Sequence, residues 1–274
     1  MAARAKEHGY AGIELGADRA QRLLDGSIDR VEMLDRFGPS DVLICCIDTG
    51  LAYTDAAKQD RLTADVLRRS IDAAQGIRCP AVAIAGARVK PGATRSTVAV
   101  AMGDWLLPLG DYAAERGVKL LVRNSLSFKV AGEMWLVLDR LSHPAIACGW
   151  DVVNGVIAGE SPAVSVPTLN SRIVQVHVDD AEIDGGNAAS VPLGTGDVPL
   201  KTFFTRMRGI GFGGWVVYTP GTRGAAGAPE ESLPAAMKYF LEVAEPRPKE
   251  KGRGVVKPSP KKGVGGGGPT TGGS

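Results

Sequence analysis

Short runs of β-branched and other apolar residues recur along this chain, with longer amphipathic stretches between them. We expect strands at residues 12–15, 41–48, 81–87, 118–123, 145–151, 173–180 and 215–219. Between the second and third runs, apolar residues recur at three- and four-residue steps from Leu62 to Ala74, which makes one apolar helical face. Strands that are apolar on both faces and separated by whole helices indicate parallel neighbours. The pattern therefore predicts a repeated βαβ architecture joined by right-handed crossovers.

The spacing of these strands suits either a barrel or a doubly wound sheet. No G-x-G-x-x-G follows the first strand, so a dinucleotide-binding sheet has little support. The sequence offers seven strands and opens with the helix-like stretch AARAKEHG at residues 2–9. We therefore expect a TIM-type (β/α) barrel that lacks its first strand. Either the barrel is open at one seam, or the sequence lacks the start of an ancestral protein. Open strand edges favour pairing with another chain, so a homo-oligomer formed through the seam is expected.

Composition divides the chain into two parts. Residues 1–245 have enough apolar character for one large core and form the predicted barrel domain. Residues 246–274 are rich in Pro, Gly and Lys, without apolar periodicity, and are predicted to be a disordered tail. The tail carries seven Lys/Arg against one Glu, so the overall charge of +2 leaves the barrel domain near −4. Nucleic acid is therefore an unexpected partner, except for weak binding through the tail.

The cysteines and the lack of apolar targeting segments indicate the cellular compartment of the protein. The four cysteines show no C-x-x-C spacing and no metal-binding pattern with the three histidines, which indicates reduced thiols. Cys45 and Cys46 read as strand residues, one facing inward and one outward. The sequence contains no apolar run of membrane-spanning length and no segment that resembles a signal peptide. We expect a cytoplasmic protein without a membrane partner.

Four segments carry a family resemblance. They are AKEHGYAGIEL at 5–15, AAERGVKLLVRN at 113–124, RIVQVHVDDA at 172–181 and PLGTGDVPLKTFFTRMRGIGFGGWVVYT at 192–219. In this order and spacing they resemble the xylose isomerase-like TIM-barrel family of sugar phosphate isomerases and epimerases, over roughly residues 3–244. The resemblance implies a divalent cation, Mn²⁺, Mg²⁺, Zn²⁺ or Co²⁺, held at the barrel mouth by two glutamates, an aspartate and a histidine. Such a cation polarises a sugar oxygen while the carboxylates move a proton.

On the fifth and sixth strands of that family pattern, this chain keeps only part of the ligand set. The glutamate position of the fifth strand is Arg123, in LLVRNS. The aspartate of the sixth strand is matched by Asp151, but the histidine that usually follows it is Asn154. A cation therefore replaces an anion at one ligand position.

The last two strands show the same partial match. The histidine of the seventh strand is His177, followed by Asp180 at the family's aspartate position. At the end of the eighth strand, where the family has its second glutamate, the chain has Thr219. Without the resemblance, a histidine inside an apolar strand, as His177 is, is more often a hydrogen-bonded core residue than a functional one. Glu14 is either a carboxylate at the mouth or merely the polar end of a strand.

These replacements predict that no metal cofactor is bound, with Asp151 and His177 as vestiges of the metal site. The guanidinium of Arg123 is always protonated and would repel a divalent cation a few ångströms away. We expect Arg123 to pair with Asp151 instead, because the ancestral ligands on neighbouring strands shared one ion.

The Gly-Thr-Gly segment at 194–196 reads as a turn leading into a helix from Pro199, with Asp197 near the helix N-terminus.

Two functions stay open, so whether the chain is an enzyme is left undecided. The first is a sugar isomerase- or epimerase-like protein whose metal-dependent activity has been lost. The alternative is a non-catalytic binder, a pseudoenzyme, that takes a small sugar or an anionic ligand at the mouth, where Arg123 would supply a fixed positive charge. An endonuclease of the family's DNA-repair branch would need a zinc site rich in His and Glu, and three histidines in the whole chain argue against it.

Overall fold

We describe the chain from a computed structural model. It describes residues 2–37, 41–221, 223–224 and 229–244, which belong to one compact unit, Met1–Ala244. The domain boundary predicted after residue 245 and the predicted tail at 246–274 lie outside the described residues.

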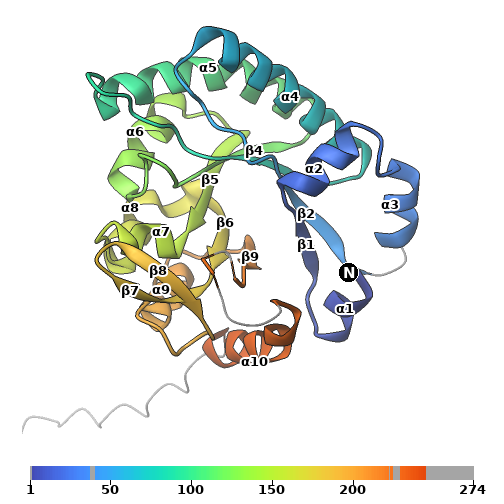
Figure 1. Cartoon of the computed structure of the whole chain (residues 1–274), viewed down its shortest axis with the longest axis vertical. Coiled ribbons are helices and arrows are strands. Elements are labelled where there is room, and N and C mark those ends of the chain that lie inside the picture. Colours follow the sequence, from blue (N-terminus) through green and yellow to red (C-terminus); the bar gives the residue numbers. More distant parts are fainter. Residues whose placement is uncertain (1, 38–40, 222, 225–228, 245–274) are drawn as a thin grey trace, which may run out of the picture. The chain divides into compact units, whose positions relative to one another are not determined.

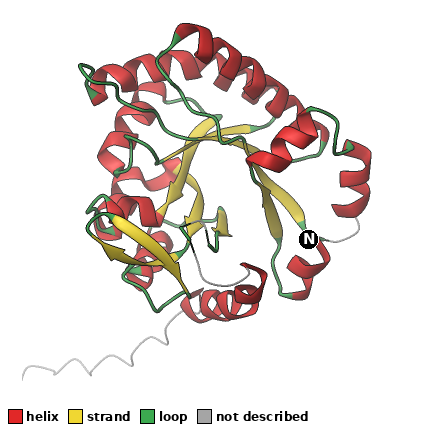
Figure 2. Ribbon diagram, in the orientation of Figure 1, coloured by secondary structure: helices red, strands yellow, loops and turns green. Residues whose placement is uncertain are grey.

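All seven predicted strands are present and form one parallel sheet. In sheet order they are β1 (Gly12–Leu15), β2 (Leu43–Asp48), β3 (Ala81–Ile84), β4 (Lys119–Arg123), β5 (Ile146–Asp151), β6 (Ile173–Val178) and β9 (Trp215–Tyr218). Within the compact unit the strands form the inner ring and the helices lie outside them (Figures 1 and 2). The fold is a nearly closed TIM-type barrel of seven strands, as the strand pattern predicted.

Helices lie before, between and after the strands of the sheet. They are α1 (Ala2–Glu7), α2 (Ala17–Leu24), α3 (Arg30–Phe37), α4 (Ala57–Gly76), α5 (Arg95–Glu115), α6 (Ala131–Leu141), α7 (Val152–Ile157), α8 (Pro162–Leu169), α9 (Leu200–Gly209) and α10 (Leu233–Ala244). In α4 the apolar face predicted from periodicity packs on the sheet through Leu67, Ile71 and Ala74, but Leu62 is 53% exposed. Thr63 and Ala64 are buried in place of Leu62. The buried face of the helix is therefore turned slightly away from the face that hydropathy alone predicts.

Where the strands are regular, alternate residues face two different cores. In β3, Val82 and Ile84 belong to the large cluster between the sheet and the helices, whereas Ala81 and Ala83 belong to a small cluster inside the barrel. The predicted opposite orientation of Cys45 and Cys46 is wrong, because both thiols belong to the inner cluster. The pairing of β1 with β2 shifts by one residue between Ile13 and Glu14, and this irregularity breaks the inward–outward alternation there.

A small antiparallel hairpin follows β6 and was not predicted. The expected strand at 173–180 ends at Val178, and the chain continues into β7 (Asp180–Asp184) and β8 (Asn187–Val191). The turn between them is Gly185-Gly186, both with positive φ (53° and 88°), which suits a two-residue hairpin turn. That dipeptide is the signal by which the hairpin could have been found.

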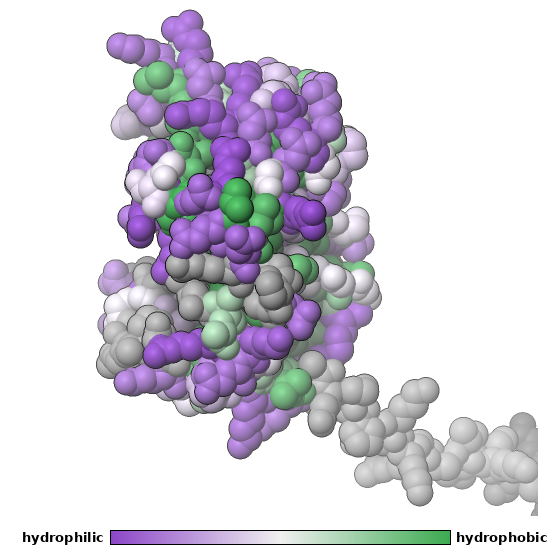
Figure 3. All heavy atoms as spheres, turned by 90° about the vertical axis from the view of Figure 1, so that its right-hand side faces the viewer, coloured by the Kyte–Doolittle hydropathy of each residue, from purple (hydrophilic) through white to green (hydrophobic). Residues whose placement is uncertain are grey.

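The barrel is open between β1 and β9, as predicted. These strands are the two ends of the sheet order, and each pairs with one neighbour only in the part of the chain that the structure describes. Near the start of both strands the Trp215 ring crosses the seam, since a Cβ added to Gly12 would lie 2.7 Å from it. The face of the molecule in Figure 3 is largely hydrophilic with a few separate hydrophobic patches, which is usual for a folded surface.

Candidate functional site

The residues picked out at four strand ends lie at one rim of the barrel. Arg123, Asp151 and His177 are at or near the carboxyl ends of β4, β5 and β6, and Asp151 is the direct register partner of His177. Thr219 directly follows β9, and its backbone N–H donates to the carbonyl of Val178 at 3.1 Å. The predicted placement at one rim is therefore confirmed, because parallel strands bring all their carboxyl ends to the same side.

Arg123 is the centre of a polar network inside this rim. Its guanidinium donates to Glu14 Oε2 at 2.7 Å and to Asp48 Oδ2 at 2.9 Å, and its Nη2 lies 3.0 Å from His177 Nε2. Gly149, the register partner of Arg123, has no side chain, and a Cβ there would meet Arg123 Cγ at 3.4 Å. The absence of that side chain gives the arginine a path across β5 to His177 on β6.

The Nε2 atom of His177 is occupied by protein partners in either tautomer. It lies 2.9 Å from Glu14 Oε2, 3.0 Å from Arg123 Nη2 and 3.2 Å from the amide nitrogen of Gln175. If Nε2 is protonated it donates to Glu14, and if it is not, its lone pair faces the guanidinium. The histidine side chain is only 4% exposed, so the imidazole is part of the network and has no water-facing ring nitrogen at Nε2.

Charges in this network stabilise the carboxylate form of Glu14. Burial works to raise its pKa, but the interactions with His177 and Arg123 outweigh burial and lower the pKa of Glu14 from 4.5 to about 2. Burial likewise disfavours the charged form of Arg123, yet Glu14 and Asp48 raise the pKa of Arg123 overall. Glu14 is therefore held as a carboxylate by its contacts with Arg123 and His177.

Asp151 does not pair with Arg123, and that prediction is wrong. The carboxylate of Asp151 accepts from Arg223 at 2.7 Å, and Arg223 also donates to Asn154 Oδ1 at 3.2 Å. Arg123 is drawn instead to Glu14 and Asp48, on β1 and β2 at the other side of the rim. The mouth thus holds two separate arginine–carboxylate groups, one around Arg123 and one around Arg223.

The strand end that carries Asp151 is fixed by two asparagines. Asn124, which is fully buried, accepts from the Asp151 N–H at 2.6 Å and donates to the Asp151 carbonyl at 2.9 Å. Asn154 donates its side-chain amide to the Asn124 carbonyl at 2.9 Å. The other carboxylate oxygen of Asp151 caps α7 by accepting from the Asn154 backbone at 3.0 Å. Asn154 therefore supports the site where the family pattern has a histidine.

Asp180 is used by the backbone of a loop. Its side chain is buried and accepts from the backbone N–H groups of Ala181, Gly194, Gly196 and Val198, at 2.7–3.2 Å. These bonds hold the Gly-Thr-Gly turn, which is the turn predicted before α9. Asp197 does not cap α9, because its carboxylate accepts from the Ile183 N–H at 2.8 Å instead.

Five residues of the site were not identified from sequence: Asp48, Asn124, Gln175, Asp179 and Arg223. Asp48 ends a strand, so its position was the available signal, and Gln175 shares the inward parity of His177. Asp179 accepts from the Ser190 hydroxyl of the unpredicted hairpin at 2.5 Å and lies 3.7 Å from Arg223. Burial raises the pKa of Asp179 above its ordinary value. Arg223 comes from the loop after β9, where no sequence pattern marks it.

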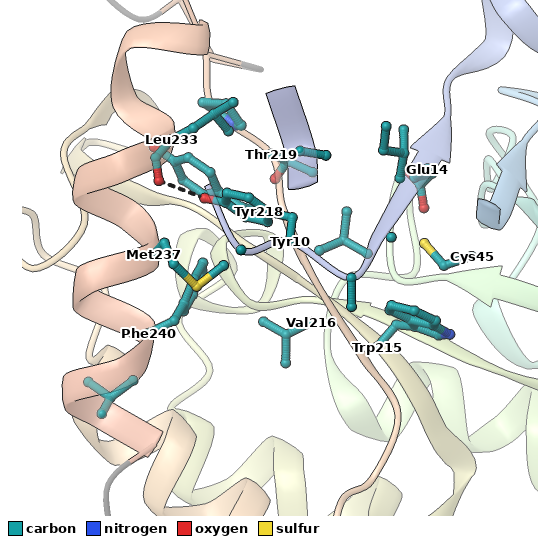
Figure 4. Close-up of a pocket in the computed structure, with 18 of the residues that line it drawn as sticks. Tyr10, Glu14, Cys45, Trp215, Val216, Tyr218, Thr219, Leu233, Met237 and Phe240 are labelled. Atoms are coloured by element: carbon teal, nitrogen blue, oxygen red, sulfur yellow. Dashed lines mark hydrogen bonds between the residues drawn. The ribbon is translucent and has the colours of Figure 1, made fainter. Parts of the chain in front are cut away.

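A large apolar pocket lies along the open seam and ends at this rim. Its volume is about 900 Å³, and Glu14 and Thr219 line it together with Trp215, Met237 and Phe240. Figure 4 shows the α10 side chains Met237 and Phe240 on one side and Glu14 and Cys45 on the other, with β9 residues between them. Tyr10 donates to the Leu233 carbonyl at 2.9 Å and ties the loop before β1 to α10.

Comparison with known proteins agrees with this architecture. The family described as "Xylose isomerase-like TIM barrel" matches residues 2–243. The chain belongs to this family. A search of curated protein sequences found no match. The described residues contain no helix with the length and hydrophobicity of a membrane span.

Solved structures of the family share the fold at low sequence identity. A xylose isomerase-like TIM barrel/4-hydroxyphenylpyruvate dioxygenase fusion protein superposes with a TM-score of 0.74 at 15% identity, and the alignment covers 88% of this chain but only 40% of that one. The IolI protein with a bound zinc atom gives 0.73 at 15% identity, with 88% and 90% coverage. The 3-keto-D-glucoside 4-epimerase YcjR from E. coli gives 0.72 at 16% identity, with 88% and 92% coverage. At this identity the likeness shows the fold alone.

The rim residues do not fit a divalent metal of the kind the family uses. The Arg123 guanidinium contacts both Glu14 and His177, and Arg223 contacts Asp151, so His177 and Asp151 each face a guanidinium. Among the residues described, no three His, Cys, Asp or Glu side chains are grouped so that they could hold an ion. A metal entering here would have to displace two hydrogen-bonded guanidinium groups, each of which supplies the positive charge that the carboxylates need.

Proposed function

We propose that this family member has lost metal-dependent isomerisation and epimerisation and binds a small neutral sugar or polyol at the barrel mouth. The observation that carries the proposal is the contact of Arg123 with Glu14 and His177, because it puts a permanent cation against the side chains that would serve a metal. A protein that has lost the metal-dependent reaction but keeps the polar barrel mouth can still bind a ligand there.

The charge of the mouth favours a neutral ligand over an anion. Two guanidinium groups, Arg123 and Arg223, are set against four carboxylates, those of Glu14, Asp48, Asp151 and Asp179. The fixed positive charge that Arg123 brings is therefore already neutralised, and an anionic group would meet a surplus of carboxylates. Sugar phosphates are accordingly disfavoured, whereas the hydroxyl groups of a polyol can donate to carboxylate oxygens.

Some of these groups are open to a ligand. The side chains of Asp48, Arg123 and Arg223 are 22%, 16% and 15% exposed, so part of each side chain is accessible although most of it is covered. Partial burial strengthens each hydrogen bond that a ligand hydroxyl makes there. The four cysteines of the compact unit are free, buried thiols, which suits the reducing cytoplasm where the proposal places this protein.

The second candidate is a catalytic isomerase or epimerase. Asp151 and His177 are retained as register partners, and structural neighbours include proteins described as D-allulose 3-epimerase and 3-keto-D-glucoside 4-epimerase. For this candidate the arginines would have to move aside when a metal and substrate bind. The binding proposal requires no such movement.

Metal and ligand titrations separate the two candidates. Isothermal titration of the purified, chelator-treated protein with Mn²⁺ and Zn²⁺ should show no stoichiometric binding. A thermal-shift screen should then show stabilisation by neutral sugars or polyols, and less by their phosphates, without added metal. Tight one-to-one metal binding by the unmodified protein would instead favour the catalytic candidate.

A further inference from the structure

β2 carries two consecutive cysteines whose side chains face the same way. In the pairing of β1 with β2, Glu14 is opposite Cys46, and Cys45 is an extra residue in the register of the two strands. A bulge of this kind sets two residues against one and re-aims a side chain. Cys45 and Cys46 accordingly both belong to the small cluster inside the barrel, where a regular strand would place only one of them.

The two thiols therefore form a vicinal pair in the barrel interior. All four cysteines of the compact unit are free and buried, but Cys79 and Cys148 belong to the outer cluster between the sheet and the helices. Cys45 and Cys46 are the only consecutive cysteines in the sequence. Because consecutive Cα atoms are about 3.8 Å apart, two neighbouring thiols on one face are close enough to bind one atom together.

The surroundings of this pair keep both thiols protonated. The inner cluster around them consists of Ala81, Ala83, Leu121 and Ala147. Burial and the negative charge of Glu14 raise the pKa of Cys45 and of Cys46 above the ordinary value. A zinc site would need thiolates and two further ligands, and no three His, Cys, Asp or Glu side chains are grouped to hold an ion among the residues that the structure describes. A ligand for this pair therefore has to bond to neutral thiols and bring no charge into the interior.

The pair borders the pocket that ends at the rim. Cys45 lines this pocket together with Glu14 and Trp215, and Figure 4 shows these three side chains toward the same side of it. Trp215 and Val217 are partly buried, pack against the inner cluster and also line the pocket. A group bonded to the two thiols therefore has apolar space beside it, through which a small uncharged reagent can enter.

We propose that Cys45 and Cys46 bind a trivalent organic arsenical, which both sulfur atoms chelate while the organic group lies in the pocket. Its hydrated form, R–As(OH)2, condenses with two neutral thiols: two As–S bonds form, two As–O bonds break, and each thiol proton leaves with a hydroxyl group as water. Arsenic stays trivalent and neither sulfur is oxidised, so the step needs no oxidant or reductant. The product is uncharged, as the apolar surroundings require. Thiol–disulfide exchange starts from the thiolate instead, so burial of the pair slows a disulfide reagent without preventing this condensation.

Phenylarsine oxide is the probe, and the measurement is intact-mass spectrometry of the native full chain. We expect one adduct per chain that a competing dithiol removes and the same concentration of a monothiol does not, since the second As–S bond is intramolecular. When the adduct is then unfolded with iodoacetamide present, peptide mapping should find Cys79 and Cys148 alkylated and the vicinal pair protected. The proposal is overturned if the native protein takes up no arsenical, or if Cys45 and Cys46 are alkylated as readily as without it.

Single variants locate the site. Cys45→Ala and Cys46→Ala each remove one of the two bonds and should weaken binding by about 100-fold or more. Cys148→Ala is the matched control, because Cys148 is as fully buried as Cys46 but lies in the outer cluster, and its affinity should stay within about twofold of the parent. Circular dichroism checks that the variants fold, and alanine suits the inner cluster, which already contains three alanines. Retention of the adduct by Cys46→Ala together with its loss in Cys79→Ala would assign the site to a different pair of thiols and overturn the proposal.

Discussion

Replacing Arg123 by Met tests the polar network at the barrel mouth most directly. The change removes the cation between Glu14 and Asp48 but keeps most of the side-chain volume, so packing next to Gly149 changes little. Glu14 is 11% exposed and would be left as a buried carboxylate that contacts His177 and the Gln175 amide but no guanidinium. Breaking a buried ion pair by removing one partner costs about 3–5 kcal/mol. For a domain of this size that corresponds to a fall in Tm of roughly 6–20 °C.

The measurement is urea unfolding followed by circular dichroism and tryptophan fluorescence at neutral pH. Arg140→Met is the matched control, because Arg140 is 49% exposed in its ion pair with Asp104 and such pairs contribute about 0–1 kcal/mol. The double variant Arg123→Met/Glu14→Gln should recover part of the loss, since it leaves no unpaired charge at Glu14. A cost for Arg123→Met no larger than that of Arg140→Met would refute the buried network as described.

The same network predicts an acid dependence of stability. The pKa of Glu14 is lowered on folding, from 4.5 to about 2, so its contribution is present in full above pH 4.5 and is lost as the pH falls toward 2. A shift of that size corresponds to about 3 kcal/mol. The penalty of Arg123→Met should therefore shrink over this range, because the parent loses the same interaction. A penalty that is constant from pH 6 to pH 3 would contradict the assignment.

Three further predictions concern other parts of the molecule. Arg123→Glu combined with Thr219→Glu places two carboxylates at the rim and should create Mn²⁺ affinity. Isothermal titration should detect this binding in the double variant and not in the parent. A double variant that folds but binds no metal would show that the rim geometry is unsuitable for other reasons. Asp180→Ala should cost about 3–5 kcal/mol in urea unfolding, because four backbone N–H groups lose their acceptor, whereas the exposed Asp184→Ala should stay within about 0.5 kcal/mol. Burial raises the pKa of Cys45, Cys79 and Cys148, so these thiols should react with a disulfide reagent only on unfolding; fast reaction of the native protein would show that the inner core opens.

The strand framework was determined by the sequence alone. Runs such as LICCI in β2 and AVAI in β3 are apolar at consecutive positions, and short runs of this kind separated by whole helices are typical of parallel strands covered on both faces. Seven parallel strands and an open seam were predicted from this pattern. The placement of Arg123, Asp151 and His177 at one rim was predictable as well, because parallel strands bring their carboxyl ends to the same side. This holds whatever the side chains contact. The hairpin after β6 escaped prediction, since its strands are short and polar and only Gly185-Gly186 marks them.

The partners of those rim residues were decided only by the tertiary structure. A guanidinium is held by the carboxylates nearest its tip, and the tip of Arg123 reaches Glu14 and Asp48, which lie 109 and 75 residues away in sequence. Asp151 is left to Arg223, from a loop with no periodicity that a sequence pattern could reveal. Local pattern fixes which strand a side chain is on and which end it occupies. Charge pairing depends on distances of a few ångströms across the barrel, and only the curved arrangement of all seven strands sets those distances.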